Sequence, residues 1–151
     1  MSDKTNEPVL QDNIRGLVQD VSEVFDEMAN TLRHKTAFAD TRPADAKTFM
    51  LISRHPRGLT ALANALGITR QATHRSVQRL VTADLVDFAY AEGSKRDMVA
   101  TLTETGLEAR KVGFGIAASI EQQVVGEIGQ DDTEALRRIL KRLSGMEPTN
   151  S

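Results

Sequence analysis

Hydrophobic residues follow the spacing of an amphipathic helix from about Leu10 to Ala39, recurring at intervals of three and four positions. No second apolar helix lies close to this segment in the sequence, so its stripe needs a partner, which indicates a dimer. The polar residues 1–9 are expected to be disordered. The stripe consists of Ile14, Leu17, Val18, Val21, Val24, Phe25, Met28 and Leu32.

The next pattern predicts a helix from Ala44 to His55, followed by two shorter helices joined by a tight turn. The first of the pair spans Ala61–Leu66, and the second runs from about Thr69 to Ala83. Thr60 and Thr69 stand where N-caps are expected, because a hydroxyl there accepts from a free N–H of the first turn. Gly67 stands at the turn, where only glycine takes positive φ without steric cost. Two helices joined in this way cross steeply, which is the arrangement of a helix-turn-helix.

Two alternating segments follow, Val86–Ala91 and Asp97–Leu102, with a turn at Glu92–Lys95 between them. This pattern predicts a two-stranded β-hairpin. Lys95 and Arg96 lie at its tip, where they would reach a phosphate or a minor groove.

A long helix, Glu104–Ile128, is predicted after the hairpin, with Thr103 as its N-cap. Glycine inside a helix usually marks close approach of another backbone, and this helix contains Gly106, Gly113, Gly115 and Gly126. A last helix is expected to begin with a capping box formed by Asp131 and Glu134 and to end near Ser144.

These elements give a mainly α (α+β) fold class, a winged helix-turn-helix with long N- and C-terminal dimerisation helices and a two-stranded β-hairpin wing. We expect residues 43–103 to form the DNA-binding winged helix-turn-helix. Residues 10–40 and 104–146 are expected to form the helical dimerisation region.

The composition excludes several classes of function. Five Phe, one Tyr and no Trp leave few platforms for stacking single-stranded bases. The absence of Cys excludes disulfides, thiolate metal sites and thiol-based redox switches. No apolar run is long enough to span a membrane and the N-terminus has no signal-peptide core, so we expect a cytoplasmic protein.

The net charge of −2 is less informative than its distribution. No acidic residue lies between Asp45 and Asp84, and chance clustering on a solvated face is the alternative to a basic patch. With 21 acids among 151 residues, so long an acid-free run is rare by chance, which favours the patch. The last helix carries Arg137, Arg138, Lys141 and Arg142. We expect these cations to stabilise the helix by complementing its dipole, and we favour this over the alternative that they form a second DNA-contacting patch. The acid-free window holds Lys47, Arg54, His55, Arg57, Arg70, His74, Arg75 and Arg79.

Signals for catalysis are weak. The histidines His34, His55 and His74 lack metal-ligand spacing. Residues 113–118 formally match G-x-G-x-x-A, but a helix rather than a strand precedes them, so a dinucleotide site is rejected. We therefore expect no enzymatic activity, no cofactor and no metal.

The second helix of the predicted pair carries donors suited to phosphates and base edges, and a major groove admits one such helix. Arg reads guanine bidentately and Gln reads adenine. We expect Arg70, Gln71, His74 and Arg75 to lie near bases or flanking phosphates, and Arg79 to contact a phosphate. The full set of candidate DNA contacts is Thr69, Arg70, Gln71, Thr73, His74, Arg75, Gln78, Arg79, Ser94, Lys95 and Arg96.

The run Leu59–Ala72 resembles the helix-turn-helix of MarR-type transcriptional regulators. Arg96, with the Leu-Thr-Glu-Thr-Gly of residues 102–106, resembles that family's wing Arg and the Leu-Thr-Glu-x-Gly start of its next helix. The resemblance covers residues 44–111 well, and the flanking helices match in order and length only. Ser94 stands where the family often has an Asp that braces the wing Arg, so either the wing is less rigid or Asp97 braces Arg96. Thr73 and Ser76 stand where apolar residues are usual.

The resemblance implies a homodimer whose recognition helices enter successive major grooves of a pseudo-palindromic operator, with the wing Arg in the minor groove. Many members of the family are repressors released by small, often phenolic, ligands bound between the two domains. We therefore expect a sequence-specific regulator of double-stranded DNA, a ligand-responsive repressor with a small aromatic effector. One alternative is a winged-helix dimer used for protein–protein contact without DNA, although such an interface does not require the acid-free window. A second alternative is a ligand sensor that touches DNA only secondarily.

Overall fold

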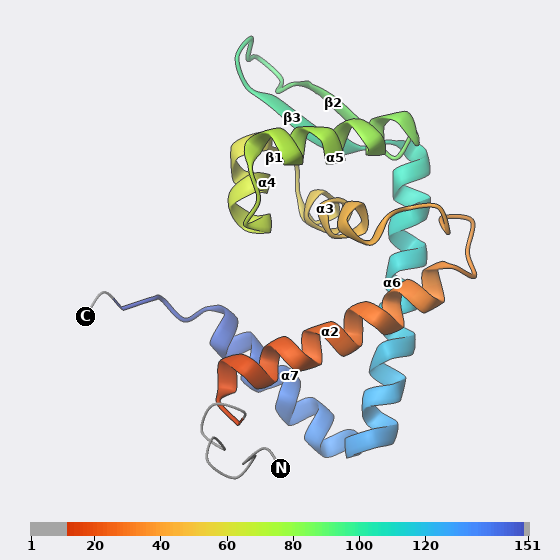
Figure 1. The fold of residues 1–151 in the computed structure, drawn as a ribbon, viewed down its shortest axis with the longest axis vertical. Helices are drawn as coiled ribbons and strands as arrows, with labels where there is room; N and C mark the ends of the chain where they lie inside the picture. The colour runs from red at the N-terminus through yellow and green to blue at the C-terminus, as the bar shows by residue number, and fades with distance from the viewer. Residues whose placement is uncertain (1–11, 150–151) are drawn as a thin grey trace, which may run out of the picture.

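The computed structural model describes residues 12–149, so the expected disorder of residues 1–9 lies outside the described part of the chain. Figure 1 shows a winged-helix unit at one end, with α6 running away from it and α7 turning off at the far end of α6. Three short strands accompany the helices. The elements are α2 (Ile14–Arg33), α3 (Pro43–Arg54), β1 (Arg57–Gly58), α4 (Leu59–Leu66), α5 (Arg70–Thr82), β2 (Val86–Tyr90), β3 (Met98–Leu102), α6 (Glu104–Ile128) and α7 (Gln130–Ser144).

The apolar core lies inside the winged-helix unit, where α3, α4 and α5 pack against one another and against the sheet. Leu62 and Val77 are fully buried, and Leu80 of α5 is almost fully buried beside them. The rest of the core comes from Ile52, Leu85, Val86, Ala100 and Ala109. This packing fixes the position of α5, because its apolar stripe faces the core while its other face stays exposed.

The helix-turn-helix forms as predicted. Gly67 has φ 67° and is the C-cap of α4, so the left-handed conformation at the turn suits glycine. Thr69 is the N-cap of α5, and its side chain accepts a hydrogen bond from the backbone N–H of Ala72 at 3.0 Å. The expected cap at Thr60 is wrong, because α4 already begins at Leu59, directly after β1, with Gly58 at the cap position.

The hairpin is part of an antiparallel sheet of three strands in the order β1-β3-β2. Phe88 pairs with Ala100 across β2 and β3, and Arg57 of β1 pairs with the same Ala100 from the other side. The hairpin therefore matches the predicted wing, and β1 is an addition that the sequence pattern did not predict.

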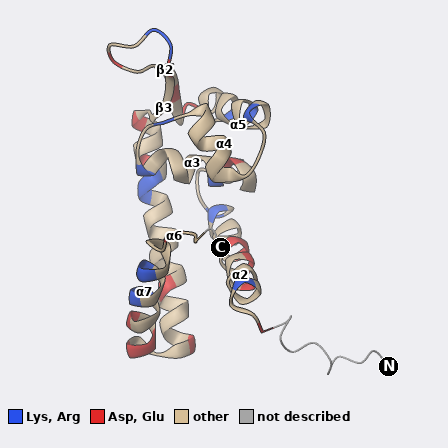
Figure 2. Ribbon diagram, turned by 90° about the vertical axis from the view of Figure 1, so that its left-hand side faces the viewer, with Lys and Arg blue, Asp and Glu red and all other residues tan. Residues whose placement is uncertain are grey.

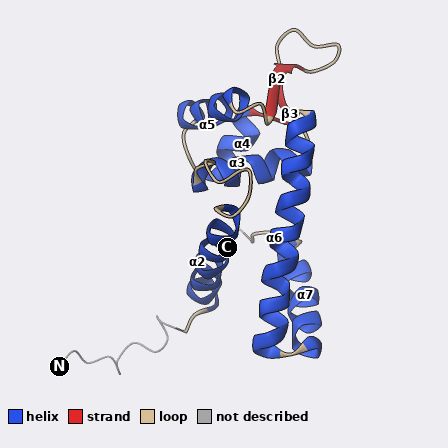
Figure 3. Cartoon of the chain, turned by 90° about the vertical axis from the view of Figure 1, so that its right-hand side faces the viewer, coloured by secondary structure: helices blue, strands red, loops and turns tan. Residues whose placement is uncertain are grey.

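Three long helices form the rest of the chain. The helix α6 has the predicted bounds, and Thr103 caps it by accepting from the backbone N–H of Gly106 at 2.9 Å. Figure 3 shows α2 standing apart from the α6–α7 pair along most of its length. Within the described residues α2 has no buried side chain, and Ile14 is 73% exposed although it belongs to the apolar stripe. Phe25, Met28 and Leu32 at the other end of the stripe are half-buried, and α2 contacts α6. The stripe therefore lacks a partner in one copy of the chain only along its N-terminal part, residues 14–24.

Two expected helix ends are wrong. The helix α2 ends at Arg33 rather than near Ala39, and turns follow it. The hydroxyl of Thr36 donates to the Arg33 carbonyl at 2.7 Å and accepts from the N–H of Phe38, which competes with helix continuation. The predicted capping box at Asp131 does not form, because α7 already begins at Gln130.

Of the four glycines in α6, only Gly106 closely approaches another segment of the described chain. A Cβ on Gly106 would lie 2.1 Å from the carbonyl oxygen of Leu85. A Cβ on Gly113, Gly115 or Gly126 would meet no atom of the described residues within 4 Å. The predicted close approach therefore holds within one chain at a single position. Among residues 12–149, no helix has both the length and the apolar character needed to cross a membrane.

Candidate functional site

The exposed face of α5 carries most of the polar residues singled out from the sequence. Arg70, Gln71, His74, Arg75 and Gln78 are all exposed, and their spacing places them on one side of the helix. The side chain of Gln78 lies 3.2 Å from His74 Nε2, and the His74 ring lies 6.1 Å from that of Phe88 on β2. The helix thus presents a row of donors on the side facing away from the core.

Thr73 must be removed from the candidate contacts. It is 0% exposed, and its hydroxyl donates to the Thr69 carbonyl at 2.9 Å, one helical turn back. Ser76 is also buried, so both polar residues at positions where apolar ones are usual face inward. Ser76 is satisfied there, because its hydroxyl donates to Asp45 Oδ1 on α3 at 2.7 Å.

Arg79 forms an ion pair across the two helices rather than standing free. Its Nε lies 2.8 Å from Asp45 Oδ2, and its Nη2 lies 2.9 Å from Oδ1. Burial alone raises the pKa of Asp45, but hydrogen bonds from Arg79 and Ser76, with the charge of Arg79, bring that pKa below its ordinary value. The same pairing raises the pKa of Arg79. Asp45, at the edge of the acid-free window, thus compensates one of its cations.

The wing places Lys95 and Arg96 at an exposed tip. Ser94 orders the turn, because its hydroxyl oxygen accepts from the backbone N–H groups of Arg96 at 3.2 Å and Asp97 at 3.1 Å. The side chain of Ser94 is therefore occupied by the turn itself. Asp97 and Arg96 form no ion pair among the residues described, so Asp97 does not brace the wing Arg.

Basic residues gather on α5 and at the hairpin tip, as Figure 2 shows. Lys47 is compensated by Asp26 of α2, with Nζ and Oδ2 2.9 Å apart. Arg70 and Arg75 form no ion pair within residues 12–149. These uncompensated cations make the outer face of α5 a surface suited to an anion with repeated charges.

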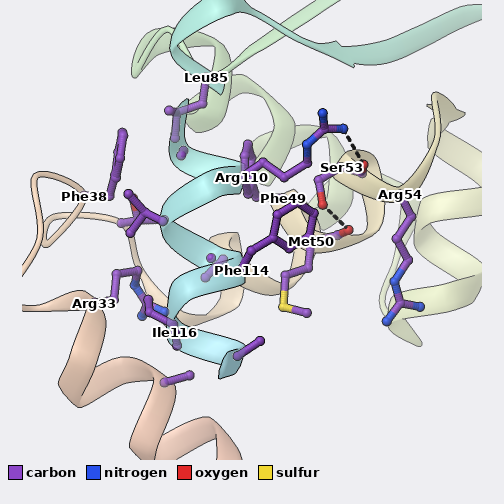
Figure 4. A pocket seen from close by; sticks show the side chains of 17 residues that line it. Arg33, Phe38, Phe49, Met50, Ser53, Arg54, Leu85, Arg110, Phe114 and Ile116 are labelled. Atoms are coloured by element: carbon purple, nitrogen blue, oxygen red, sulfur yellow. Dashed lines mark hydrogen bonds between the residues drawn. The ribbon is translucent and has the colours of Figure 1, made fainter. Parts of the chain in front are cut away.

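A cavity of about 320 Å³ lies between α2, α3 and α6. Figure 4 shows the rings of Phe49 and Phe114 at its centre, with Arg110 above them and Arg33 at its lower edge. Arg54 belongs to the lining but points away from the rings. The volume is within the range of about 300–1,000 Å³ typical of small-molecule sites.

The cavity is positively charged, because three arginines line it and no Asp or Glu does. Arg33 donates from Nη2 to Asn30 at 2.6 Å, while its buried Nε has no hydrogen-bond partner. Burial lowers the pKa of Arg33. Arg110 lies over the ring of Phe114, with 6.0 Å from its Cζ to the ring centre, and Nη1 donates to the Ser53 carbonyl at 3.4 Å. A buried N–H without an acceptor is costly, so an acceptor group in this cavity would be stabilised.

The sequence pattern gives no ligand-binding role to any residue of the cavity lining, and it gives Asp45 no role. The cavity lining runs from Ala29 to Ala117 and has no local motif. Asp45 and Arg79 are 34 positions apart, so no helical or strand spacing connects them. The only sequence signal for Asp45 was its place at the edge of the acid-free window.

Comparisons with known proteins agree with this geometry. A family model described as the MarR family matches residues 40–97. The HTH-type transcriptional regulator TcaR of Staphylococcus aureus (strain Newman) is 23% identical over 134 residues, which cover 87% of this chain and 89% of TcaR.

Solved structures show the same fold along most of the chain. The wild-type MarR of E. coli in its apo form has a TM-score of 0.71 at 20% identity, covering 86% of this chain and 96% of that one. The MarR family protein RV2887 of Mycobacterium tuberculosis, in complex with salicylic acid, has a TM-score of 0.69 at 19% identity, covering 86% of this chain and 95% of that one. The family model covers the helix-turn-helix and the hairpin tip, and the likeness to TcaR extends over most of both chains, so the chain resembles MarR-family regulators in sequence and shares their fold.

Proposed function

We propose that the chain is a transcriptional regulator that binds double-stranded DNA as a homodimer, acting as a repressor at a pseudo-palindromic operator. The observation that carries this proposal is the exposed, uncompensated row of Arg70, Gln71, His74 and Arg75 on α5. Their guanidinium, amide and imidazole donors suit the phosphates and base edges of a major groove. Lys95 and Arg96 at the hairpin tip are assigned to the flanking minor groove or its phosphates.

Salt dependence tests the DNA role. Fluorescence anisotropy of a labelled duplex at about 50 and 200 mM salt should show a steep fall in affinity, because bound phosphates release counterions. Arg75→Ala should weaken binding and leave the dimer intact. Arg138→Ala on α7 is the control, since it removes the same charge from an exposed position away from α5. Binding that is absent or insensitive to salt would refute the DNA role and favour protein–protein contact.

The proposed homodimer is supported by the unpartnered apolar surface of the long helices. Val21 and its neighbours on α2 are exposed, as are Ile139, Leu140 and Leu143 on α7. So large an apolar surface is unusual for a monomer. Sedimentation of Val21→Glu should show dissociation, whereas Gln19→Glu, on the polar side of α2, should sediment as the unchanged chain does. An unchanged chain that sediments as a monomer would refute the dimer.

We also propose that the cavity binds a small aromatic carboxylate as an effector that weakens DNA binding. Phenylalanine rings, guanidinium groups with no carboxylate in the lining and the unsatisfied Nε of Arg33 suit such a ligand. Salicylic acid, which is bound in the RV2887 complex, is an aromatic carboxylate and therefore the first probe.

The effector site is tested by thermal shift with salicylate, because a ligand that binds only the folded state raises the melting temperature. Arg33→Met should reduce the shift, whereas Arg54→Met, whose guanidinium points away from the rings, should retain it. An equal shift in the Arg33 variant would place the ligand elsewhere, and no shift in the unchanged chain would refute the site for this probe.

A further inference from the structure

We infer that Asp45 and Arg79 form a clamp that fixes the recognition helix α5 on α3, so that Arg79 is a positioning residue rather than a phosphate contact. The inference rests on the proposed DNA binding and concerns how α5 is held for it. It replaces the expectation that Arg79 contacts a phosphate.

The clamp joins the two helices by several hydrogen bonds at one point. Both carboxylate oxygens of Asp45 accept from Arg79, and Oδ1 also accepts from Ser76. Ser76 Oγ in turn lies 2.9 Å from Thr48 Oγ1, one turn further along α3. A bidentate pair fixes both distance and orientation, which a single point charge does not. The contact therefore constrains the rotation of α5 about its own axis as well as its distance from α3.

Burial decides which role Arg79 fulfils. The side chain of Asp45 is 5% exposed, whereas that of Arg79 is 41% exposed. If a phosphate drew Arg79 away, the carboxylate would remain buried without its cation, which is strongly unfavourable. Arg70 and Arg75 have no such competing partner. Arg79 also lies one turn beyond both exposed Arg75 and buried Ser76, at the border between the outer and inner faces of α5.

The two roles predict opposite effects for Asp45→Asn. An amide keeps the shape of the side chain but removes its charge and turns one acceptor into a donor. If Arg79 positions the helix, the variant reads bases less well while its number of phosphate contacts is unchanged. If Arg79 instead binds phosphate in competition with Asp45, the variant releases it, so affinity rises for every sequence and the salt slope steepens by about one.

The experiment compares affinities for a preferred duplex, selected by the unchanged chain from a random pool, and for an unrelated duplex. Asp45→Asn should lower the ratio of the two affinities about tenfold, a loss typical of one misplaced base contact. Affinity for the unrelated duplex and the salt slope should stay the same. Asp26→Asn is the control, because it removes one acid from the exposed Lys47 pair between α2 and α3. It should leave the ratio unchanged.

Arg79→Lys provides a second variant in case the first does not fold. Lysine keeps the charge but lacks the planar fork, so positioning predicts a reduced ratio and simple phosphate binding predicts a ratio close to that of the unchanged chain. The double variant should lose no more than the larger single loss, because both changes break one unit.

Three results would overturn the clamp. These are higher affinity of Asp45→Asn for both duplexes, an unchanged ratio in both variants, or a parallel loss for both duplexes that follows the folded fraction measured by circular dichroism. If the unchanged chain shows no salt-dependent DNA binding, the proposed function fails and the clamp fails with it. If that chain binds and the variants discriminate equally well, only the clamp fails.

Discussion

Replacing Gly106 by Ala tests how tightly the start of α6 is packed against the segment that follows α5. The new Cβ would lie 2.1 Å from the Leu85 carbonyl oxygen and 3.3 Å from Leu102 Cβ. Close C···O contacts between backbones rarely fall below about 3.3 Å, so the Leu85 backbone must shift by roughly 1 Å. That oxygen accepts from the backbone N–H of Thr103 at 3.2 Å, so the shift also weakens a hydrogen bond.

The magnitude follows from three opposing contributions. Overpacking costs about 1–3 kcal/mol. A weakened hydrogen bond costs about 1 kcal/mol. Alanine regains about 1 kcal/mol of helix propensity. The net expectation is a loss of about 1–3 kcal/mol, or roughly 2–4 °C in melting temperature per kcal/mol for a chain of this size.

The assay is urea unfolding followed by circular dichroism, with all variants at one protein concentration because a dimer's stability depends on it. Gly126→Ala is the matched control on the same helix, since its Cβ would meet no atom of the described residues within 4 Å. The control should gain up to about 1 kcal/mol. A Gly106 variant as stable as the unchanged chain would refute the packing argument, as would a control that loses as much stability as the Gly106 variant.

Three further changes have expected outcomes. Gly67→Ala should cost about 1 kcal/mol in urea unfolding, because φ is 67° there, and no loss would mean that the turn relaxes. Thr103→Val should cost about 1–2 kcal/mol, because it removes the cap on Gly106 and the hydroxyl bond to the Asp84 carbonyl, and a smaller loss than for an exposed Thr elsewhere would contradict this. Asp45 has its pKa lowered below the ordinary 3.8, so its contribution to stability is full above that pH and declines as the pH falls toward the folded-state value. In Asp45→Asn the free energy of unfolding should therefore fall less steeply as the pH drops below 3.8. The same fall in the variant and in the unchanged chain would show that Asp45 does not contribute to this pH dependence.

The parts of the fold that were predictable depend on local signals. The bounds of α6 follow from Thr103 as N-cap and from a periodic stripe, and the turn between α4 and α5 follows from Gly67. The strand β1 has only two residues, and its extended form is held by pairing with β3, which is distant in sequence. The early end of α2 coincides with tight backbone turns and with the hydrogen bonds of the Thr36 hydroxyl, and a count of apolar spacing registers neither of them.

Some residues of the candidate site are also predictable from local signals, whereas others depend on contacts between distant segments. The exposed donors of α5 follow from helical spacing, whereas the burial of Thr73 depends on what α5 packs against. A threonine on the inner face is tolerated because its hydroxyl is satisfied by its own helix. Asp45 and the cavity arginines become informative only when distant segments meet, and their hydrogen bonds link positions such as 45 with 79 and 53 with 110.

Because α6 is attached to the winged-helix unit at one end, a tilt of this helix moves α5. Its first turn is fastened to the end of α5, because the Thr103 hydroxyl donates to the Asp84 carbonyl at 2.5 Å. From there α6 continues for 25 residues to the turn into α7. A helix of that length measures about 37 Å, so a tilt of α6 by about 5° displaces α5 at the opposite end by about 3 Å. This is close to the rise of one base pair, about 3.4 Å. In the proposed dimer, a change of a few degrees in the angle between the two copies of α6 would therefore change the distance between the two α5 helices by about one base pair.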